Sequence, residues 1–258
     1  MSRYCCATFD TKEGPLHGHQ GKLYQPFPAT GAPSRLAGKR DLVRLIRGEP
    51  RAGYAYVMRS VVLEDGELRQ TGCGPNFRDG YTTLCTCKHR MRTSLSADEW
   101  QGRWVAGLTS VGCGRHRWLF YLALIKEAYE SQSELWHSDA LPPEVRQAKS
   151  ARYSELGDLY EPKGELYSAA RFDPNRYHPP GPGHSHRSNA CDEGWHTDIN
   201  YNGKKGLKRK AKRPPSLLVG DPQFSFLWRK PLLYADGRWR QKNYGTLGEF
   251  LEALKEAG

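Results

Sequence analysis

The sequence predicts a mixed α+β domain built around a small, mostly antiparallel sheet with short helices. Three observations support this fold class. Aromatic and β-branched runs of strand length begin near residue 53, the segments between them are helical or rich in turn residues, and the chain closes with an amphipathic helix. The 258 residues are enough to bury a hydrophobic core without disulfide or metal staples.

The first 50 residues are predicted to form an N-terminal arm that is partly irregular. Up to about residue 40 the chain is rich in glycine, proline and polar residues and shows no apolar periodicity. Residues 40–50 are expected to make one short helical turn. The folded domain is therefore expected to span residues 51–258.

The first regular elements are predicted from aromatic and apolar runs. Residues 53–63 and 102–110 each have the composition of one strand. Between them, "CKHRMRTSLSADEW" (87–100) suits a short basic helix capped by Thr83 or Thr86. The run at 117–131 fits a buried strand as well as a buried helix, and its β-rich first half favours a strand that leads to a helix or turn near Glu127.

The second half of the chain is predicted to contain a loop-rich insertion at about 131–215. One helix is expected in it, in "PPEVRQAKSARYSEL" (142–156), because proline is tolerated in a first helical turn. Residues 216–234 are expected to form two short strands around the "GDP" turn at 220–222. An amphipathic helix is expected at 246–258.

The charge of the chain indicates a polyanionic partner. Lysine and arginine total 39 against 28 acidic residues, a net charge of +11, so nucleic acid is the first partner to consider. Part of this excess lies in "KKGLKRKAKRPP" (204–215), and such a run is equally often only a solvated segment. No apolar stretch approaches the length of a membrane span, so a cytoplasmic protein without a membrane partner is expected.

The cysteines are predicted to be reduced thiols. There are seven, unevenly spaced, which is unlike a disulfide framework. Cys85 and Cys87 form a C-x-C pair, whereas zinc ligands are usually separated by two to four residues. Zinc would also need two further ligands. Small buried residues are the favoured interpretation, and no metal or other cofactor is expected.

A candidate phosphate-binding edge lies in "GYTTLCTCKHRMRTS" (80–94). On a helix Lys88 and Arg92 share one face at i,i+4, and Arg90 adds a third cation to the block. A helix start that follows a loop adds unpaired backbone N–H groups, which suit a phosphate. The alternative is a solvated helix face without a ligand.

Candidate base-binding residues surround this basic block. Tyr56, Phe77 and Trp104 supply faces on which a base can stack. Asn76 and Thr83 supply hydrogen-bonding groups for a base edge. Trp104 fits the protein core equally well, and Asn76 fits a turn after a proline.

"WHTDIN" (195–200) places His196 and Asp198 one residue apart in a polar segment. A histidine and a carboxylate can share a proton in acid–base chemistry, so these two are the candidate catalytic residues. The alternative is a pair of exposed loop residues. Asp158 and Asp221 are most simply turn residues.

The block "GPNFRDGYTTLCTCKHRMRTS", with "GRWVAGLTS" and "RWLFYLALIKEAYE" after it, resembles the second of the nucleotide-modification-associated domain families. The chain departs from that pattern at Cys85 and His89, where a small residue and a proline are expected. The matching positions are Pro75, Asn76, Phe77, Gly80, Thr83, Leu84, Cys87, Lys88 and Arg92. The order of elements is also similar to PUA-like base-binding domains.

The resemblance implies a PUA-like fold, and a place in phage or bacterial gene neighbourhoods that modify DNA bases. The expected function is binding of a nucleotide or a modified nucleic-acid base in a DNA-modification or defence system, in the cytoplasm of a bacterial or phage-infected cell. Two alternatives remain at this point. One is an enzyme that alters a base with His196 and Asp198, and the other is a zinc-stabilised interaction module.

Overall fold

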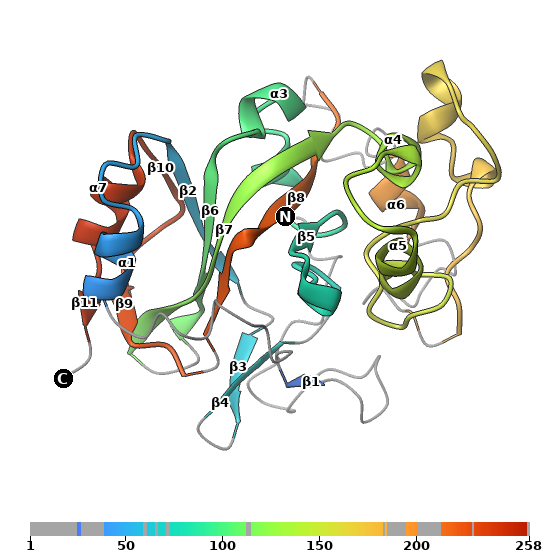
Figure 1. Ribbon diagram of the computed structural model, residues 1–258. Helices are drawn as coiled ribbons and strands as arrows, with labels where there is room; N and C mark the ends of the chain where they lie inside the picture. Colours follow the sequence, from blue (N-terminus) through green and yellow to red (C-terminus); the bar gives the residue numbers. More distant parts are fainter. Residues whose placement is uncertain are drawn as a thin grey trace. The chain divides into compact units, whose positions relative to one another are not determined.

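The computed structural model describes residues 25–26, 39–58, 61–64, 67–70, 73–111, 115–182, 184, 195–200, 213–228 and 230–256. These residues form two compact units, coloured along the chain in Figure 1. The helical unit contains Gly72–Gln101 and Glu127–Val219. The sheet unit contains Tyr24–Thr71, Gly102–Lys126 and Gly220–Gly258.

The sheet unit is built on a curled, mostly antiparallel sheet (Figure 1). The strand order is β10-β2-β6-β7-β8, in which the β2–β6 pair is parallel and the β10–β2 and β6–β7 pairs are antiparallel. The first residues of β7 also pair with β9, which pairs with β11. The strands are β2 (Gly53–Met58), β6 (Trp104–Thr109), β7 (His116–Tyr129), β8 (Leu217–Leu227), β9 (Leu233–Asp236), β10 (Lys242–Tyr244) and β11 (Lys255–Glu256).

Two smaller pairings complete the strands. A separate sheet has the order β1-β4-β3, formed by β1 (Gln25–Pro26), β4 (Glu67–Gln70) and β3 (Val61–Glu64). In the helical unit, β5 (Thr83–Leu84) pairs with the first residues of β8. The mixed α+β class and the mostly antiparallel sheet are thus confirmed.

Helices α1 (Lys39–Leu45) and α7 (Leu247–Glu252) lie side by side in the sheet unit (Figure 1). Leu42 and Ile46 are one helical turn apart and enter the same apolar cluster as Leu247 and Phe250. Burying a large aliphatic or aromatic side chain contributes about 1.5–3 kcal/mol. Residues 39–50, although predicted as part of an arm, therefore belong to the packed unit.

The helical unit consists of short helices joined by turns. Its helices are α2 (His89–Arg92), α3 (Ala97–Trp100), α4 (Gln132–His137), α5 (Pro143–Lys149) and α6 (His196–Ile199), with 3₁₀ turns at Arg78–Gly80, Ser168–Phe172 and Pro174–Arg176. Ser96 and Ser131 cap α3 and α4, each in a reciprocal pair with the glutamate three residues later. One apolar cluster comprises Cys85, Leu135, Leu141, Val145, Leu159, Leu217 and Val219.

Several sequence expectations about the elements are corrected. Residues 53–63 do not form one strand: β2 and β3 belong to different sheets. The "GDP" segment lies inside β8, where Asp221 Oδ1 accepts the Gln223 N–H at 2.8 Å and the strand continues. β7 runs past Glu127 to Tyr129, and the helix or turn expected near Glu127 is found a few residues later, as α4 from Gln132.

The predicted cap of the basic helix is also wrong. Residue Lys88 occupies the N-cap position of α2 in a left-handed conformation (φ 61°), and no side chain caps the helix. Thr83 is in β5, and the Thr86 hydroxyl lies 3.1 Å from Cys73 Sγ. Both threonines are held by partners elsewhere in the unit.

The described cysteines are in two states. Cys73 and Cys85 are buried free thiols, as predicted. Cys87 is disulfide-bonded, so the prediction of a reduced thiol is wrong there. Sequence spacing carries no information on how close two Cβ atoms come in the fold, and that distance decides whether a disulfide can form.

Among the described residues, no helix combines the length and apolar character needed to cross a bilayer.

Candidate functional site

Arg92, a predicted phosphate ligand, is fully buried in the helical unit. Its guanidinium donates to backbone carbonyls of two chain segments more than 120 residues apart. The acceptors are Cys87 O at 2.7 Å, Thr86 O at 2.9 Å, Pro215 O at 2.9 Å and Ser216 O at 2.7 Å. A phosphate would have to displace these contacts, so the geometry gives Arg92 a structural role.

Asn76 and Thr83, the predicted readers of a base edge, hydrogen-bond within the protein. Their backbones pair with each other at 2.8 and 2.9 Å. The Asn76 side chain donates to Leu156 O at 3.1 Å and accepts from Lys149 Nζ at 2.9 Å. Thr83 donates to the Asp158 carboxylate at 3.0 Å. Both side chains are buried, and their polar atoms hold the core of the unit together.

Lys149 and Asp158 form a buried polar centre that the sequence reasoning missed. The Lys149 ammonium donates to Asn76 and also to Tyr81 O at 2.9 Å. Burial lowers the pKa of Lys149 to about 8, and the Asp158 carboxylate opposes this shift. Burial raises the pKa of Asp158 to about 6, opposed by Lys149 and by the hydrogen bond from Thr83. Near neutral pH both groups are therefore charged, and each stabilises the charge of the other.

The predicted stacking aromatics lie in apolar cores. Trp104, 1% exposed, is stacked with Phe226 in the sheet unit at a centroid distance of 6.4 Å. Tyr56 is also 1% exposed, and its hydroxyl lies 2.5 Å from that of Tyr121. Phe77 is buried in the helical unit. Each of these three rings is thus buried inside its own unit, Tyr56 and Trp104 in the sheet unit and Phe77 in the helical unit.

The remaining residues of the basic block are nearer to solvent. Arg90 is exposed and Lys88 is half-buried. A surface salt bridge joins Arg213 to Glu99 at 2.8 Å in the same unit. The basic run at 204–213 lies outside the described residues except for Arg213.

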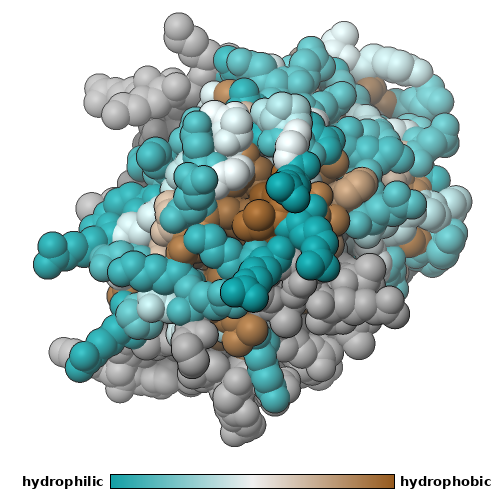
Figure 2. Space-filling view, turned by 60° about the vertical axis from the view of Figure 1, so that its left-hand side comes forward, coloured by the Kyte–Doolittle hydropathy of each residue, from teal (hydrophilic) through white to brown (hydrophobic). Residues whose placement is uncertain are grey.

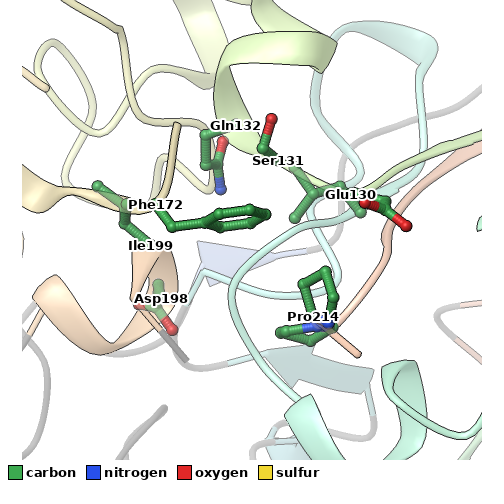
Figure 3. A pocket seen from close by; sticks show the side chains of 9 residues that line it. Glu130, Ser131, Gln132, Phe172, Asp198, Ile199 and Pro214 are labelled. Atoms are coloured by element: carbon green, nitrogen blue, oxygen red, sulfur yellow. The ribbon is translucent and has the colours of Figure 1, made fainter. Parts of the chain in front are cut away.

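A small polar pocket lies near Asp198 in the helical unit (Figure 3). It has about 10 Å³ of space for the centre of a water molecule, enough for about one water and far too little for a nucleotide. The Phe172 ring points into it (Figure 3). The lining residues are Glu130, Ser131, Gln132, Phe172, Asp198, Ile199, Pro214, Pro215 and Leu217.

Asp198 and His196, the predicted acid–base pair, both lie on the four-residue helix α6. Positions two apart on a helix differ by about 200° in direction, so the two side chains leave different sides. The buried Asp198 carboxylate lies 2.9 Å from His89 Nε2 and accepts from the Tyr160 hydroxyl at 3.3 Å. His196 packs against Trp195 instead. The geometry therefore pairs Asp198 with His89.

No group of three or more His, Cys, Asp or Glu side chains in the described part of the chain is placed to hold a metal ion.

A basic surface lies on α1 of the sheet unit. Arg40, Arg44 and Arg47 are exposed and follow one another at i, i+4 and i+7, which places them on one side of the helix and its final turn. Leu42 and Ile46 point the other way, into the core. We call these three arginines the arginine face. Figure 2, which brings this side forward, shows hydrophilic residues around a hydrophobic patch.

The arginine face combines a shared helical side with the absence of acidic partners. No ion pair joins Arg40, Arg44 or Arg47 to a described acidic side chain. Other arginines form ion pairs, as in Arg51–Glu49, Arg152–Glu161, Arg171–Glu134 and Arg176–Asp173. Exposed Arg90, Arg115, Arg238 and Arg240 resemble the arginine face in having no ion pair with a described acidic side chain, but they do not form a row on one helix. The arginine spacing in "KRDLVRLIR" was a sequence signal for this surface that the reasoning from sequence did not use.

No family model, curated protein or solved structure matches the chain. The resemblance to nucleotide-modification-associated domains therefore stays a prediction, and the function must be argued from the chemistry of the described residues.

Proposed function

We propose that this protein binds nucleic acid through phosphate contacts of the arginine face. The observation that carries the proposal is the row formed by Arg40, Arg44 and Arg47, exposed and without a described acidic partner. Arginine presents several N–H donors in a planar fork that fits phosphate oxygens. The net charge of +11 adds a long-range attraction for the same ligand.

The helix gives the three arginines a useful spacing. With a rise of about 1.5 Å per residue, Arg44 and Arg47 lie roughly 6 and 10 Å along the axis from Arg40. Long side chains on such a row can reach neighbouring phosphates of one strand. The packing of Leu42 and Ile46 into the core fixes the orientation of the row.

The resemblance noted in the sequence extends the proposal to its setting. In this setting the protein is a PUA-like sheet domain that binds a nucleotide or a modified base. It acts in the cytoplasm of a bacterial or phage-infected cell, within a DNA-modification or defence system. The curled, mostly antiparallel sheet and the basic surface support this part of the proposal. In this proposal phosphate contacts give affinity and position, and carry no base information.

Binding of labelled oligonucleotides to variants of the full chain tests the proposal. The variant Arg40→Gln/Arg44→Gln/Arg47→Gln is compared with Arg152→Gln/Arg176→Gln/Arg213→Gln, which removes the same charge from arginines with acidic partners. Fluorescence anisotropy between about 50 and 200 mM salt gives the affinity and its salt dependence. We expect the first variant to bind more weakly, with a slope of log K against log salt reduced by about 0.9 per lost duplex phosphate contact.

The matched variant should keep most of the affinity and slope, because its arginines form surface ion pairs. If both variants lose the same affinity, the effect is one of net charge and the arginine face is not the site. Absence of binding by the wild-type protein at the lowest salt concentration would reject nucleic-acid binding altogether.

A further inference from the structure

A cluster of three rings lies on one side of the sheet unit, away from the predicted base-binding residues. His116 and Trp118 come from β7 and Tyr234 from β9. The ring centroids are 4.1 Å apart for His116 and Tyr234, 5.2 Å for Trp118 and Tyr234, and 6.0 Å for His116 and Trp118. We call this cluster the ring platform.

Strand pairing explains why the three rings meet. Trp118 pairs directly with Tyr234 in the antiparallel β7–β9 ladder, and His116 is two residues away on the same face. The intervening positions point to the opposite face, where Leu119, Leu233 and Ala235 are in the apolar core. The platform is thus the outer face of strands whose inner face is packed.

The rings of the platform are partly exposed, whereas several other aromatic rings of the sheet unit are buried. All three of its residues are half-buried, whereas Trp104, Phe226 and Trp228 of the same unit are buried. Exposed apolar side chains adjoin it along the chain: Leu232 (39% exposed) precedes β9, and Val111 (46% exposed) lies near Gly237 in the turn after β9. A partly exposed aromatic surface of this kind offers flat faces on which another ring can stack.

Cations adjoin the ring platform. Lys255 pairs with Tyr234 in the β9–β11 ladder, which places it on the same face of the sheet. Exposed Arg115 precedes His116, and exposed Arg238 follows in the turn after β9. Asp236 lies on this face too, and its carboxylate accepts the Arg238 backbone N–H at 2.8 Å. Lys255 on the face, with Arg115 and Arg238 next to the strands in sequence, suits an anionic ligand with a planar, apolar part.

We infer that the ring platform stacks an unpaired base, so that the nucleic-acid partner of this protein is single-stranded or carries a single-stranded segment. This inference rests on the proposed function and names its substrate class. In a duplex, base faces are covered by neighbouring base pairs, whereas in a single strand they are open to aromatic side chains. Arg115, Arg238 and Lys255 then lie where the flanking phosphates would pass.

The test uses Trp118→Leu and Tyr234→Leu in the full chain, with Trp118→Phe as the variant that keeps a ring. The probes are a labelled oligothymidylate of about one dozen nucleotides and a blunt duplex of equal length. Trp239→Leu is the matched control. Its ring is also half-buried in the sheet unit, but its indole N–H donates to the Tyr244 hydroxyl at 2.9 Å, outside the platform.

We expect each leucine variant to lose single-strand affinity by about 5- to 150-fold, the effect of removing one stacked base. Duplex affinity and the salt slope should not change, because stacking releases no counterions. Trp118→Phe should keep most of the affinity, and Trp239→Leu should match the wild type. Binding should also quench the tryptophan fluorescence of the wild type more than that of Trp118→Leu.

The outcomes separate this inference from the proposed function. If the leucine variants keep the wild-type melting temperature and single-strand affinity, the ring platform is not a stacking site, although the arginine face still binds phosphate. A change of oligomeric state in Trp118→Leu, with unchanged oligonucleotide affinity, would assign the platform to contacts between copies of the chain and overturn the inference. If one leucine variant does not fold, the other gives the answer.

Discussion

Arg92 and Arg44 carry the same charge but lie in opposite environments. Arg92 is buried among backbone carbonyls, and Arg44 is exposed on α1. The spacing of Lys88 and Arg92 predicted a shared surface, but a guanidinium that orients toward phosphate oxygens orients equally well toward carbonyl oxygens. Residue type alone therefore could not separate a ligand contact from a structural one, and the burial of Arg92 decides it.

Replacing Arg92 by lysine is expected to destabilise the protein by about 1–3 kcal/mol. Lysine keeps the charge, but its compact ammonium cannot reach all four carbonyls, and a buried acceptor left without a donor has a cost of this size. Chemical denaturation measures the change. Arg90→Lys, at an exposed position, is the control and should stay within about 0.5 kcal/mol of the wild type. Equal stabilities for both variants would contradict the structural role of Arg92.

The Lys149–Asp158 centre predicts a pH dependence of stability. The folded-state pKa of Asp158 is raised to about 6 from an ordinary value near 3.8, chiefly by burial, so the folded protein binds this proton more tightly than the unfolded chain does. The contribution of Asp158 to the free energy of unfolding therefore falls as pH rises from about 4 to about 6. Its full size is on the order of 2–3 kcal/mol.

Asp158→Asn should remove this dependence. We expect the stability difference, wild type minus variant, to decrease across that pH window, as measured by urea denaturation at several pH values. Lys149 stays protonated throughout this range in the folded state, since its pKa is lowered only to about 8. A difference that is constant or increases with pH would contradict the assignment.

At the scale of elements, the sequence predicted most of the segments that have a strong hydrophobic period. It missed segments whose packing partners are distant in the chain. The β-rich run of β6 is found as expected. The helix predicted at 246–258 is found only over Leu247–Glu252 as α7, and Lys255–Glu256 form strand β11 instead. β7 is buried on both faces along most of its length, so it has no alternation that distinguishes a strand from a helix. The capping pattern S-x-x-E at 131–134 was a usable signal for α4 that composition obscured.

The contact between β6 and β7 predicts opposite results for two glycine substitutions. A Cβ at Gly107 would lie 2.1 Å from the Tyr121 ring, whereas at Gly53 in β2 its nearest neighbours would be 3.9 Å away. Gly107→Ala should therefore destabilise the protein by about 1–3 kcal/mol through overpacking. Gly53→Ala should be neutral or slightly stabilising. Thermal unfolding of both variants checks this, and equal melting temperatures would contradict the close approach.

At the scale of the whole molecule, net charge favours a polyanionic partner but does not indicate which surface would contact it. Hydrogen-bonding residues such as Asn76 and Thr83 fit a base edge and a polar interior equally well, and their long-range partners Lys149 and Asp158 are not visible in a local pattern. The predicted insertion at 131–215 likewise provides much of the helical unit. Its apolar residues follow no period, yet Leu135, Leu141 and Val145 meet in one cluster.

The division into two units has a consequence for how such a protein can arise. Within the described part, the chain passes from one unit to the other after Thr71, Gln101, Lys126 and Val219. Neither unit corresponds to a continuous stretch of gene, so end-to-end fusion of two ancestral genes cannot have produced this arrangement, and no single recombination breakpoint can exchange one unit for another.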